Sequence, residues 1–132
     1  MGFFFYLTKN ISLDNISVSD ISDDDIGEVI TMDETLTDST YLILLALLKP
    51  QHGYAIMKEI TVLTEGKVEV GPASMYTILK KLVKSEWIRL EESSDRKKIY
   101  HITPKGIDVL KQEVQRRKIF YQAGAKMLEQ FD

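Results

Sequence analysis

The chain of 132 residues contains no cysteine and only three prolines, and no apolar run in it is long enough to cross a membrane. The missing cysteines exclude disulfides, zinc-thiolate sites and thiol catalysis, and they fit a reducing compartment. A membrane helix needs about 18 consecutive apolar residues. The apolar residues 2–7 form a short run that no basic residue precedes, unlike a signal peptide. We therefore expect a soluble, cytoplasmic protein with no membrane partner.

The net charge of −3 averages two unlike parts. Residues 1–34 hold one base and eight acids, whereas residues 35–132 hold sixteen bases and twelve acids. We expect residues 1–34 to form a disordered acidic arm, and Met32 offers an alternative start just before the ordered region. The remaining part has the basic balance of a domain that binds nucleic acid.

Two helices are predicted at the start of the basic part. Thr37 is a candidate N-cap for a buried first helix over the apolar residues 41–48, which Lys49 and Pro50 close. A second helix is expected over residues 53–65, and Gly66 ends it. The apolar side chains of this second helix fall on one face: Ile56, Ile60 and Leu63.

A third helix is predicted to open at Gly71 and Pro72, because proline is well tolerated in a first helical turn. At 100° per residue, one sector is apolar and consists of Met75, Ile78, Leu79, Leu82 and Val83. The opposite side carries small, polar and basic residues: Ala73, Ser74, Tyr76, Thr77, Lys80, Lys81 and Lys84. This helix is thus expected to bury one face and to present the other to solvent.

A β-hairpin and a long last helix complete the prediction. Residues 87–91 and 98–102 alternate in hydropathy, with Ile88 and Leu90 on one side of the first strand and Tyr100 and Ile102 on one side of the second. Three adjacent cations lie at or beside the hairpin tip: Arg96, Lys97 and Lys98. Thr103 and Pro104 provide an N-cap and a first turn for a helix to about residue 130. The order predicts an α+β, mainly α, winged helix-turn-helix fold with a two-stranded wing.

This arrangement predicts binding to double-stranded DNA. A helix about 10–12 Å wide fits the major groove, where base edges are distinguishable. We expect Ala73, Ser74, Tyr76 and Thr77 to contact bases or phosphate, and the basic residues Lys80, Lys81, Lys84, Arg96, Lys97 and Lys98 to contact the backbone or the minor groove. Residues 71–105 carry eight bases against four acids. The alternative is a helical domain with ordinary solvent-exposed lysines.

Residues 36–106 also resemble the winged helix domain of the PadR family. The matching segments are residues 41–48 (YLILLALL), 52–56 (HGYAI), 71–76 (GPASMY), 79–82 (LKKL), 87–88 (WI) and 100–106 (YHITPKG). The resemblance implies a homodimeric transcriptional regulator, commonly a repressor, that often responds to phenolic or other aromatic small molecules. The chain departs from the family where Ala73-Ser74-Met75-Tyr76 replaces a Gly followed by Thr-Leu-Tyr, and where Trp87 replaces a Gly or Leu.

Only 26 residues follow Gly106, so the chain resembles the short subclass with one dimerisation helix. We expect residues 35–106 to form the DNA-binding domain and residues 107–132 the dimerisation helix. Its predicted seam consists of Ile107, Leu110, Val114, Tyr121, Leu128 and Phe131, interrupted by Arg117 and Gly124. The alternative is a helix that packs wholly on its own domain. A dimer would suit an inverted-repeat operator.

No enzyme activity, cofactor or metal site is predicted. The only histidines, His52 and His101, lie in different elements, and no phosphate-binding loop or nucleophile motif is present. Trp87 is expected to pack in the core, with a role in the wall of an effector pocket as the alternative. Tyr54 is likewise expected to pack, with the DNA backbone as its alternative contact. The competing function is a protein-interaction module, an antirepressor or adaptor, whose acidic arm covers the basic face.

Overall fold

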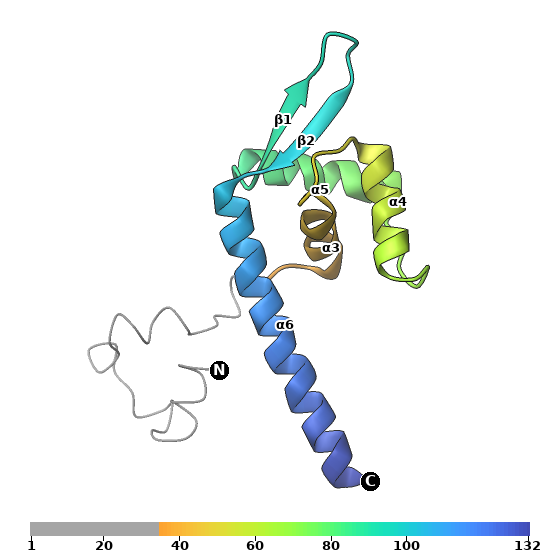
Figure 1. Ribbon diagram of the computed structural model, residues 1–132, viewed down its shortest axis with the longest axis vertical. Helices are drawn as coiled ribbons and strands as arrows, with labels where there is room; N and C mark the ends of the chain where they lie inside the picture. Colours follow the sequence, from red (N-terminus) through yellow and green to blue (C-terminus); the bar gives the residue numbers. More distant parts are fainter. Residues whose placement is uncertain (1–34) are drawn as a thin grey trace, which may run out of the picture. The chain divides into compact units, whose positions relative to one another are not determined.

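The computed structural model describes residues 35–132, in which Leu36–Asp132 form one compact unit. The acidic arm expected over residues 1–34 lies outside the described residues. The elements follow the order α3 (Asp38–Ala46), α4 (Gly53–Leu63), α5 (Pro72–Lys84), β1 (Ile88–Glu92), β2 (Lys98–Ile102) and α6 (Pro104–Phe131) (Figure 1). The predicted mainly helical winged helix-turn-helix fold is confirmed.

The predicted helix starts are confirmed by their capping contacts. The Thr37 hydroxyl accepts a hydrogen bond from the Thr40 amide at 3.2 Å, and the Thr103 hydroxyl accepts one from the Gly106 amide at 3.1 Å. These bonds satisfy amides that have no partner in a first helical turn. Pro72 and Pro104 occupy first turns, where a missing amide hydrogen costs nothing.

The core surrounds α3, whose apolar residues point to several sides. Ile43, Leu44 and Leu47 are fully buried, and they pack with residues of the other elements. These are Ile56 and Ile60 from α4, Met75, Leu79 and Leu82 from α5, and Ile88, Tyr100 and Leu110. Ile78 and Val83 are partly buried against the same cluster, so the apolar sector predicted for α5 is confirmed.

The predicted end and inner face of α4 need correction. The helix ends at Leu63 rather than near residue 65, because Glu65 and Gly66 take φ values of 54° and 77°, which reverse the chain. The Thr64 hydroxyl donates to the Ile60 carbonyl at 2.8 Å and helps to close this end. Leu63 was expected to be buried, but it is 49% exposed because it lies in the last turn of α4.

The hairpin is antiparallel and pairs Ile88 with Ile102 and Glu92 with Lys98. The sequence analysis placed Trp87 in the first strand, but β1 begins at Ile88. The Trp87 amide instead donates to the Leu82 carbonyl at 3.1 Å and closes the end of α5. Ile88 is buried, but Leu90 on the same side of the strand is 40% exposed because the outer part of the hairpin projects beyond the domain (Figure 1). Only the base of the hairpin therefore contributes to the core.

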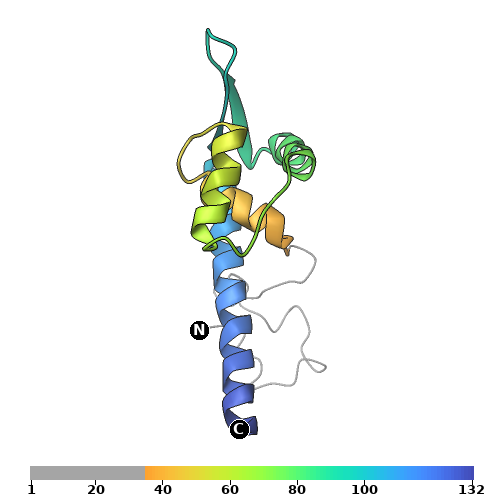
Figure 2. The same cartoon turned by 90° about the vertical axis from the view of Figure 1, so that its right-hand side faces the viewer.

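Helix α6 packs on the domain with its first half only. Its buried residues are Gly106, Leu110 and Glu113, and every residue from Phe120 onward is exposed. Figures 1 and 2 show the rest of the helix running clear of α3, α4 and α5. With about 1.5 Å of rise per residue, the helix is about 42 Å long. The alternative of a helix that packs wholly on its own domain is therefore wrong.

Candidate nucleic-acid interface

Helix α5 exposes the face that the sequence assigned to DNA. All seven residues of that face are exposed, while Met75, Leu79 and Leu82 on the other side are buried. The exposed residues are Ala73, Ser74, Tyr76, Thr77, Lys80, Lys81 and Lys84. Figure 2 shows α5 end-on beside the base of the hairpin, with which it is in contact through β1. The interface candidates of helix and hairpin thus belong to neighbouring elements.

The first turns of α5 present small groups. Ala73 and Ser74 follow Pro72 directly, and no side chain caps the helix start at Gly71. The Thr77 hydroxyl donates to the Ala73 carbonyl at 2.9 Å, so its only hydrogen is used within the helix. Thr77 therefore offers a methyl group and an acceptor oxygen to a ligand, a combination suited to a thymine methyl contact.

Tyr76 connects α5 to the start of α4. A β-carbon placed on Gly53 would lie 2.5 Å from the Tyr76 hydroxyl oxygen and 3.0 Å from the Met75 methyl carbon. A β-carbon at position 53 would therefore require the Tyr76 ring, which is itself half exposed, to shift. The buried Tyr100 has a raised pKa, because burial disfavours its phenolate and because Tyr76 lies nearby. Tyr76 thus brings a hydroxyl group to the amino end of α4, at the edge of the exposed face.

The lysines of α5 carry charge that no described residue neutralises. Lys80, Lys81 and Lys84 form no ion pair with another residue in the range 35–132. Lys81 and Lys84 lie in the last turn, where a positive charge interacts favourably with the helix dipole. This leaves the three ammonium groups available to phosphate oxygens.

The hairpin tip is a closed turn that displays two unpaired cations. The Ser93 amide donates to the Lys97 carbonyl at 2.9 Å, and the Arg96 amide donates to the Ser93 carbonyl at 2.9 Å. Arg96 itself takes φ 64°, an uncommon value for a residue with a side chain. Arg96 and Lys98 make no ion pair within the described part of the chain, whereas Lys97 lies 3.9 Å from Asp95.

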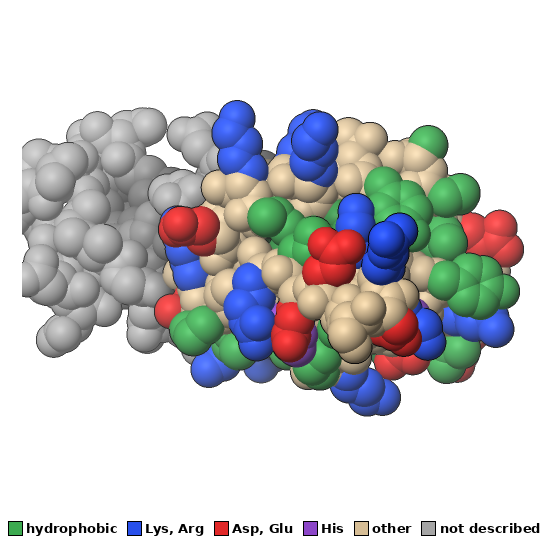
Figure 3. All heavy atoms as spheres, turned by 90° about the horizontal axis from the view of Figure 1, so that it is seen from above, with side chains coloured by type: hydrophobic (Ala, Val, Ile, Leu, Met, Phe, Trp, Pro, Cys, Tyr) green, Lys and Arg blue, Asp and Glu red, His purple; other side chains and the backbone are tan. Residues whose placement is uncertain are grey.

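Acidic residues share the hairpin with these cations. A hydrogen bond from the Ser93 hydroxyl lowers the pKa of Asp95, which keeps this exposed carboxyl ionised. Further down, Glu91 lies 2.7 Å from the imidazole of His101 and 3.6 Å from Arg89. Figure 3 looks onto the hairpin end and shows basic side chains (blue) spread over this face with acidic ones among them. The positive charge of the wing is thus concentrated at Arg96 and Lys98.

Three residues for which the sequence left alternatives now have defined positions. Trp87 is partly buried and packs against the core cluster, in agreement with its expected core role. The packing role expected for Tyr54 is wrong, because its side chain is 64% exposed and the Lys58 ammonium lies 4.9 Å from its ring centre. His52 is exposed at the start of α4 and makes no capping hydrogen bond through its side chain.

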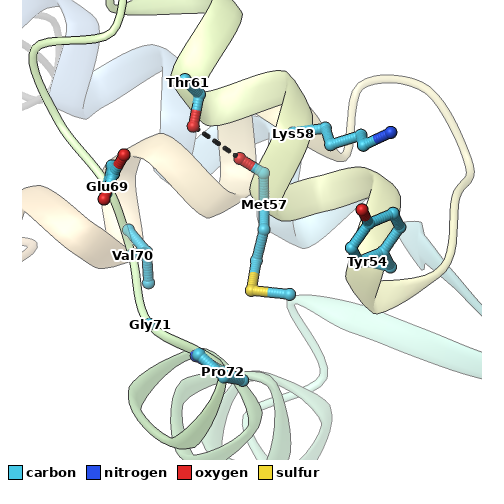
Figure 4. Close-up of a pocket in the computed structure, with 8 residues that line it drawn as sticks. All are labelled: Tyr54, Met57, Lys58, Thr61, Glu69, Val70, Gly71 and Pro72. Atoms are coloured by element: carbon cyan, nitrogen blue, oxygen red, sulfur yellow. Dashed lines mark hydrogen bonds between the residues drawn. The ribbon is translucent and has the colours of Figure 1, made fainter.

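An open groove of about 460 Å³ runs between α4 and the segment that enters α5 (Figure 4). In this view the Met57 side chain extends from α4 toward Pro72 in the first turn of α5. The groove combines apolar and aromatic surface with one base and one acid, and it is lined by Tyr54, Met57, Lys58, Thr61, Glu69, Val70, Gly71 and Pro72. No sequence pattern predicts this groove, because its two walls are brought together only by the turn between α4 and α5.

The predicted seam residues of α6 fall into two groups. Leu110 belongs to the core of its own domain and Ile107 is partly buried, whereas Val114, Tyr121, Leu128 and Phe131 are exposed. Two further apolar residues that the sequence analysis missed, Phe120 and Met127, are 52% and 64% exposed. At 100° per residue they lie on the same side of α6 as Tyr121, Leu128 and Phe131. The same heptad pattern, started one residue earlier, would have included them.

Within residues 35–132, no three histidine, aspartate or glutamate side chains are placed so as to hold a metal ion. None of the helices in this range combines the length and apolar character needed to cross a membrane.

Comparison with known proteins agrees with the fold. Residues 42–112 match the Transcriptional regulator PadR-like family. A transcriptional regulator from Clostridium thermocellum, Cth-833, has a similar structure at 26% identity and a TM-score of 0.63, covering 74% of this chain and 97% of that one. A PadR family transcription regulator from Clostridium difficile R20291 is similar at 24% identity and a TM-score of 0.62, covering 70% and 99%.

A further structure with a similar fold belongs to a DNA-binding protein regulated by a small molecule. Bordetella bronchiseptica BpsR, whose DNA binding is regulated by 6-hydroxynicotinic acid, is 16% identical with a TM-score of 0.58, covering 71% of this chain and 67% of that one. A search of curated proteins finds no match to the sequence.

Proposed function

Since the chain belongs to the PadR-like family of DNA-binding transcriptional regulators, which are not enzymes, we propose that it is a homodimeric repressor of an inverted-repeat operator. The observation that carries this proposal is the exposed face of α5, whose lysines have no ion-pair partner among the described residues and which lies beside a hairpin tip with two more such cations. A repressor in this sense excludes other proteins from the DNA that it covers.

Each exposed residue takes a role that its chemistry allows. Ser74 and Thr77 in the first turns of α5 read base edges in the major groove, and Ala73 allows close approach. Lys80, Lys81 and Lys84 bind phosphates, and Tyr76 reaches the backbone beside the start of α4. Arg96 at the hairpin tip enters the minor groove of the flanking DNA, and Lys97 and Lys98 bind the adjacent backbone.

A second copy of the chain covers the exposed apolar side of α6. Phe120, Tyr121, Met127, Leu128 and Phe131 form a stripe that is too apolar to remain in water along a helix detached from its domain. Two such helices packed together bury the stripe by the knobs-into-holes geometry of a coiled coil. The resulting twofold axis matches an inverted repeat whose half-sites lie about one helical turn apart.

An aromatic or phenolic small molecule is the proposed effector, and the groove between α4 and the segment that enters α5 is its proposed binding site. Tyr54, Met57 and Val70 supply a surface for an aromatic ring, and the Lys58 ammonium suits a carboxylate or phenolate group. A ligand at Pro72 shifts the first turn of α5 and so alters DNA affinity. The ligand of BpsR, an aromatic carboxylate, has this chemistry.

Selection of bound sites from random duplex DNA by the full-length protein tests the proposed function. An inverted repeat is the expected outcome, with an affinity that falls steeply as salt rises because bound phosphates release counterions. Selected sites without symmetry would contradict the dimer, and an affinity that does not change with salt would contradict the use of the lysine face.

The second candidate is a protein-interaction module, which the exposed apolar stripe of α6 also favours. In this alternative another protein covers the stripe, and the acidic residues 1–34 compete with DNA for the basic face. Deleting residues 1–31 and comparing DNA affinity with the full chain tests whether the arm competes with DNA. A higher DNA affinity after the deletion supports competition between the arm and DNA, and an unchanged affinity excludes it.

A further inference from the structure

The buried charge of α6 lies at the point where the helix leaves the domain. Glu113 is 3% exposed and is the only charged residue buried among those described. It is also the last fully buried residue of α6, because only partly buried or exposed residues follow it. Glu113 therefore marks the end of the fully buried part of α6.

Both carboxylate oxygens of Glu113 are bound by donors in fixed directions. Arg116 donates from Nε to Oε1 at 3.0 Å and from Nη2 to Oε2 at 2.7 Å, and Arg117 donates from Nε to Oε2 at 2.7 Å. The backbone amide of Leu36 donates to Oε1 at 3.4 Å from the segment before α3. The bonds from the two arginines, which lie on α6 itself, are charge-assisted and directional. Glu113 is linked to the segment before α3 by the longer bond from the Leu36 amide and, through Arg117, to α3.

The same cluster fastens α6 to the first turns of α3. Arg117 donates from Nη2 to Asp38 at 2.8 Å, and its guanidinium carbon lies 4.2 Å from the centre of the Tyr41 ring. Asp38 and Tyr41 are separated from Arg117 by more than seventy residues in sequence. This cluster thus connects the helix of the proposed dimer to the domain that carries α5.

We propose that Glu113 is a positioning residue that sets the angle between α6 and the winged helix domain, and thereby the spacing of half-sites that the dimer accepts. The inference rests on the proposed function, since the spacing between half-sites affects binding only when a dimer binds an inverted repeat. Buried ion pairs often contribute little to stability. Their better-attested role is to select one packing arrangement of the elements they join over alternative arrangements.

A small change of angle at Glu113 has a large effect at a distance. The 18 residues from Glu113 to Phe131 span about 27 Å, so a rotation of about 10° moves the far end by about 5 Å. That displacement exceeds the rise of about 3.4 Å per base pair. Loss of the fixed angle is therefore expected to change the half-site spacing that the dimer binds best.

The first experiment measures affinity for inverted repeats whose half-sites are separated by one base pair more or less than the selected spacing. The wild-type dimer is expected to lose about tenfold in affinity per added or removed base pair, and Glu113→Leu about threefold or less. Glu129→Gln, which removes an exposed carboxylate from the same helix, is the matched control and is expected to keep the wild-type profile. A folded, dimeric Glu113→Leu with the wild-type profile overturns the proposal.

A second measurement needs no DNA. Because the chain has no cysteine, Ser85→Cys at the end of α5 gives one spin-label site per protomer. The distance between the two labels is expected to be narrowly distributed in the wild-type background and broadened or shifted by about 5 Å in the Glu113→Leu background. An unchanged distribution overturns the proposal, whereas the absence of dipolar coupling in the wild type overturns the dimer itself.

Arg117→Gln provides a milder variant should Glu113→Leu fail to fold. It removes the link to Asp38 and leaves the two bonds between Glu113 and Arg116. Its spacing profile and label distance are expected to fall between those of the wild type and of Glu113→Leu. Wild-type values in both measurements for a folded Arg117→Gln count against the proposal.

Discussion

Gly106 in the first turn of α6 lies directly against the backbone of Trp87, so that a β-carbon on Gly106 would come within 2.1 Å of the Trp87 carbonyl oxygen. The same carbonyl accepts the Thr103 amide at 3.0 Å, and the Thr103 hydroxyl donates to the Glu86 carbonyl at 2.7 Å. These contacts join the end of α5 to the start of α6. They explain the threonine at position 103 and the glycine at position 106.

Gly106→Ala is therefore expected to destabilise the fold. The obstructing atom is backbone and cannot rotate away, so the free energy of unfolding should fall by about 3 kcal/mol, measured by urea denaturation. Gly71→Ala is the matched control, because a β-carbon at Gly71 meets no atom within 4 Å and should cost less than about 1 kcal/mol. Equal losses for the two variants would contradict this account.

Gly53→Ala is expected to affect DNA binding more than stability. The new β-carbon would press on the Tyr76 hydroxyl and the Met75 methyl, which are the far ends of flexible side chains. The unfolding free energy should fall by only about 1 kcal/mol, while displacement of Tyr76 should weaken operator binding by about tenfold. In the double variant with Tyr76→Phe, part of the stability loss should be recovered, and strictly additive losses would rule out this contact.

The sequence was sufficient to predict the helix starts at Thr37, Pro72 and Pro104, and the two faces of α5, because these follow from local capping and periodicity. The sequence places Leu63 on the inner face of α4 and Leu90 on one side of β1 with Ile88, yet both are exposed, since periodicity identifies a face but not how far the neighbouring elements extend. The role of Glu113 escaped prediction because its partners at Leu36 and Asp38 are brought to it only by the tertiary fold.

Substitutions on the exposed face of α5 should separate phosphate contacts from base contacts. Lys80→Ala is expected to weaken binding to all sequences. It should also reduce the slope of log affinity against log salt concentration by about 1.8, because the proposed dimer loses one phosphate contact in each protomer. Ser74→Ala should change the preferred base at one position of the half-site and leave the salt slope unchanged. The measurement is a DNA titration repeated over a series of salt concentrations, with Lys118→Ala on α6 as control. A salt slope that Lys80→Ala leaves unchanged would show that Lys80 does not contact phosphate.

Leu128→Glu should dissociate the proposed dimer. A charge in the middle of the apolar stripe is expected to raise the dissociation constant about 100-fold, equivalent to about 2.7 kcal/mol. Gln122→Glu introduces the same charge on the opposite side of α6 and should leave the dimer intact. Sedimentation velocity distinguishes the two states, and a Leu128→Glu protein that sediments as the wild type would place the dimer contact elsewhere.

The stability contributed by Glu113 should be lost in acid. Burial alone would raise the pKa of this carboxyl, but hydrogen bonds from Arg116, Arg117 and the Leu36 amide outweigh it and hold the pKa below the ordinary value of 4.5. A carboxyl with a lower pKa in the folded state stabilises the fold above pH 4.5, and this contribution is lost as the pH falls through the folded value. Glu113→Gln should thus be less stable than the wild type by about 2 kcal/mol at pH 7, somewhat less than for a fully buried pair because solvent reaches Arg117.

The difference between the wild type and Glu113→Gln should shrink as the pH is lowered, because protonation leaves the wild type with a neutral carboxyl in the same position. Urea denaturation at pH 7 and below pH 4 measures it, with Glu129→Gln as the control whose difference from the wild type should be small at both values. A difference for Glu113→Gln that stays constant over this range would show that the two arginines do not stabilise the charged form, and the directional bonds at the exit of α6 would then lose their energetic basis.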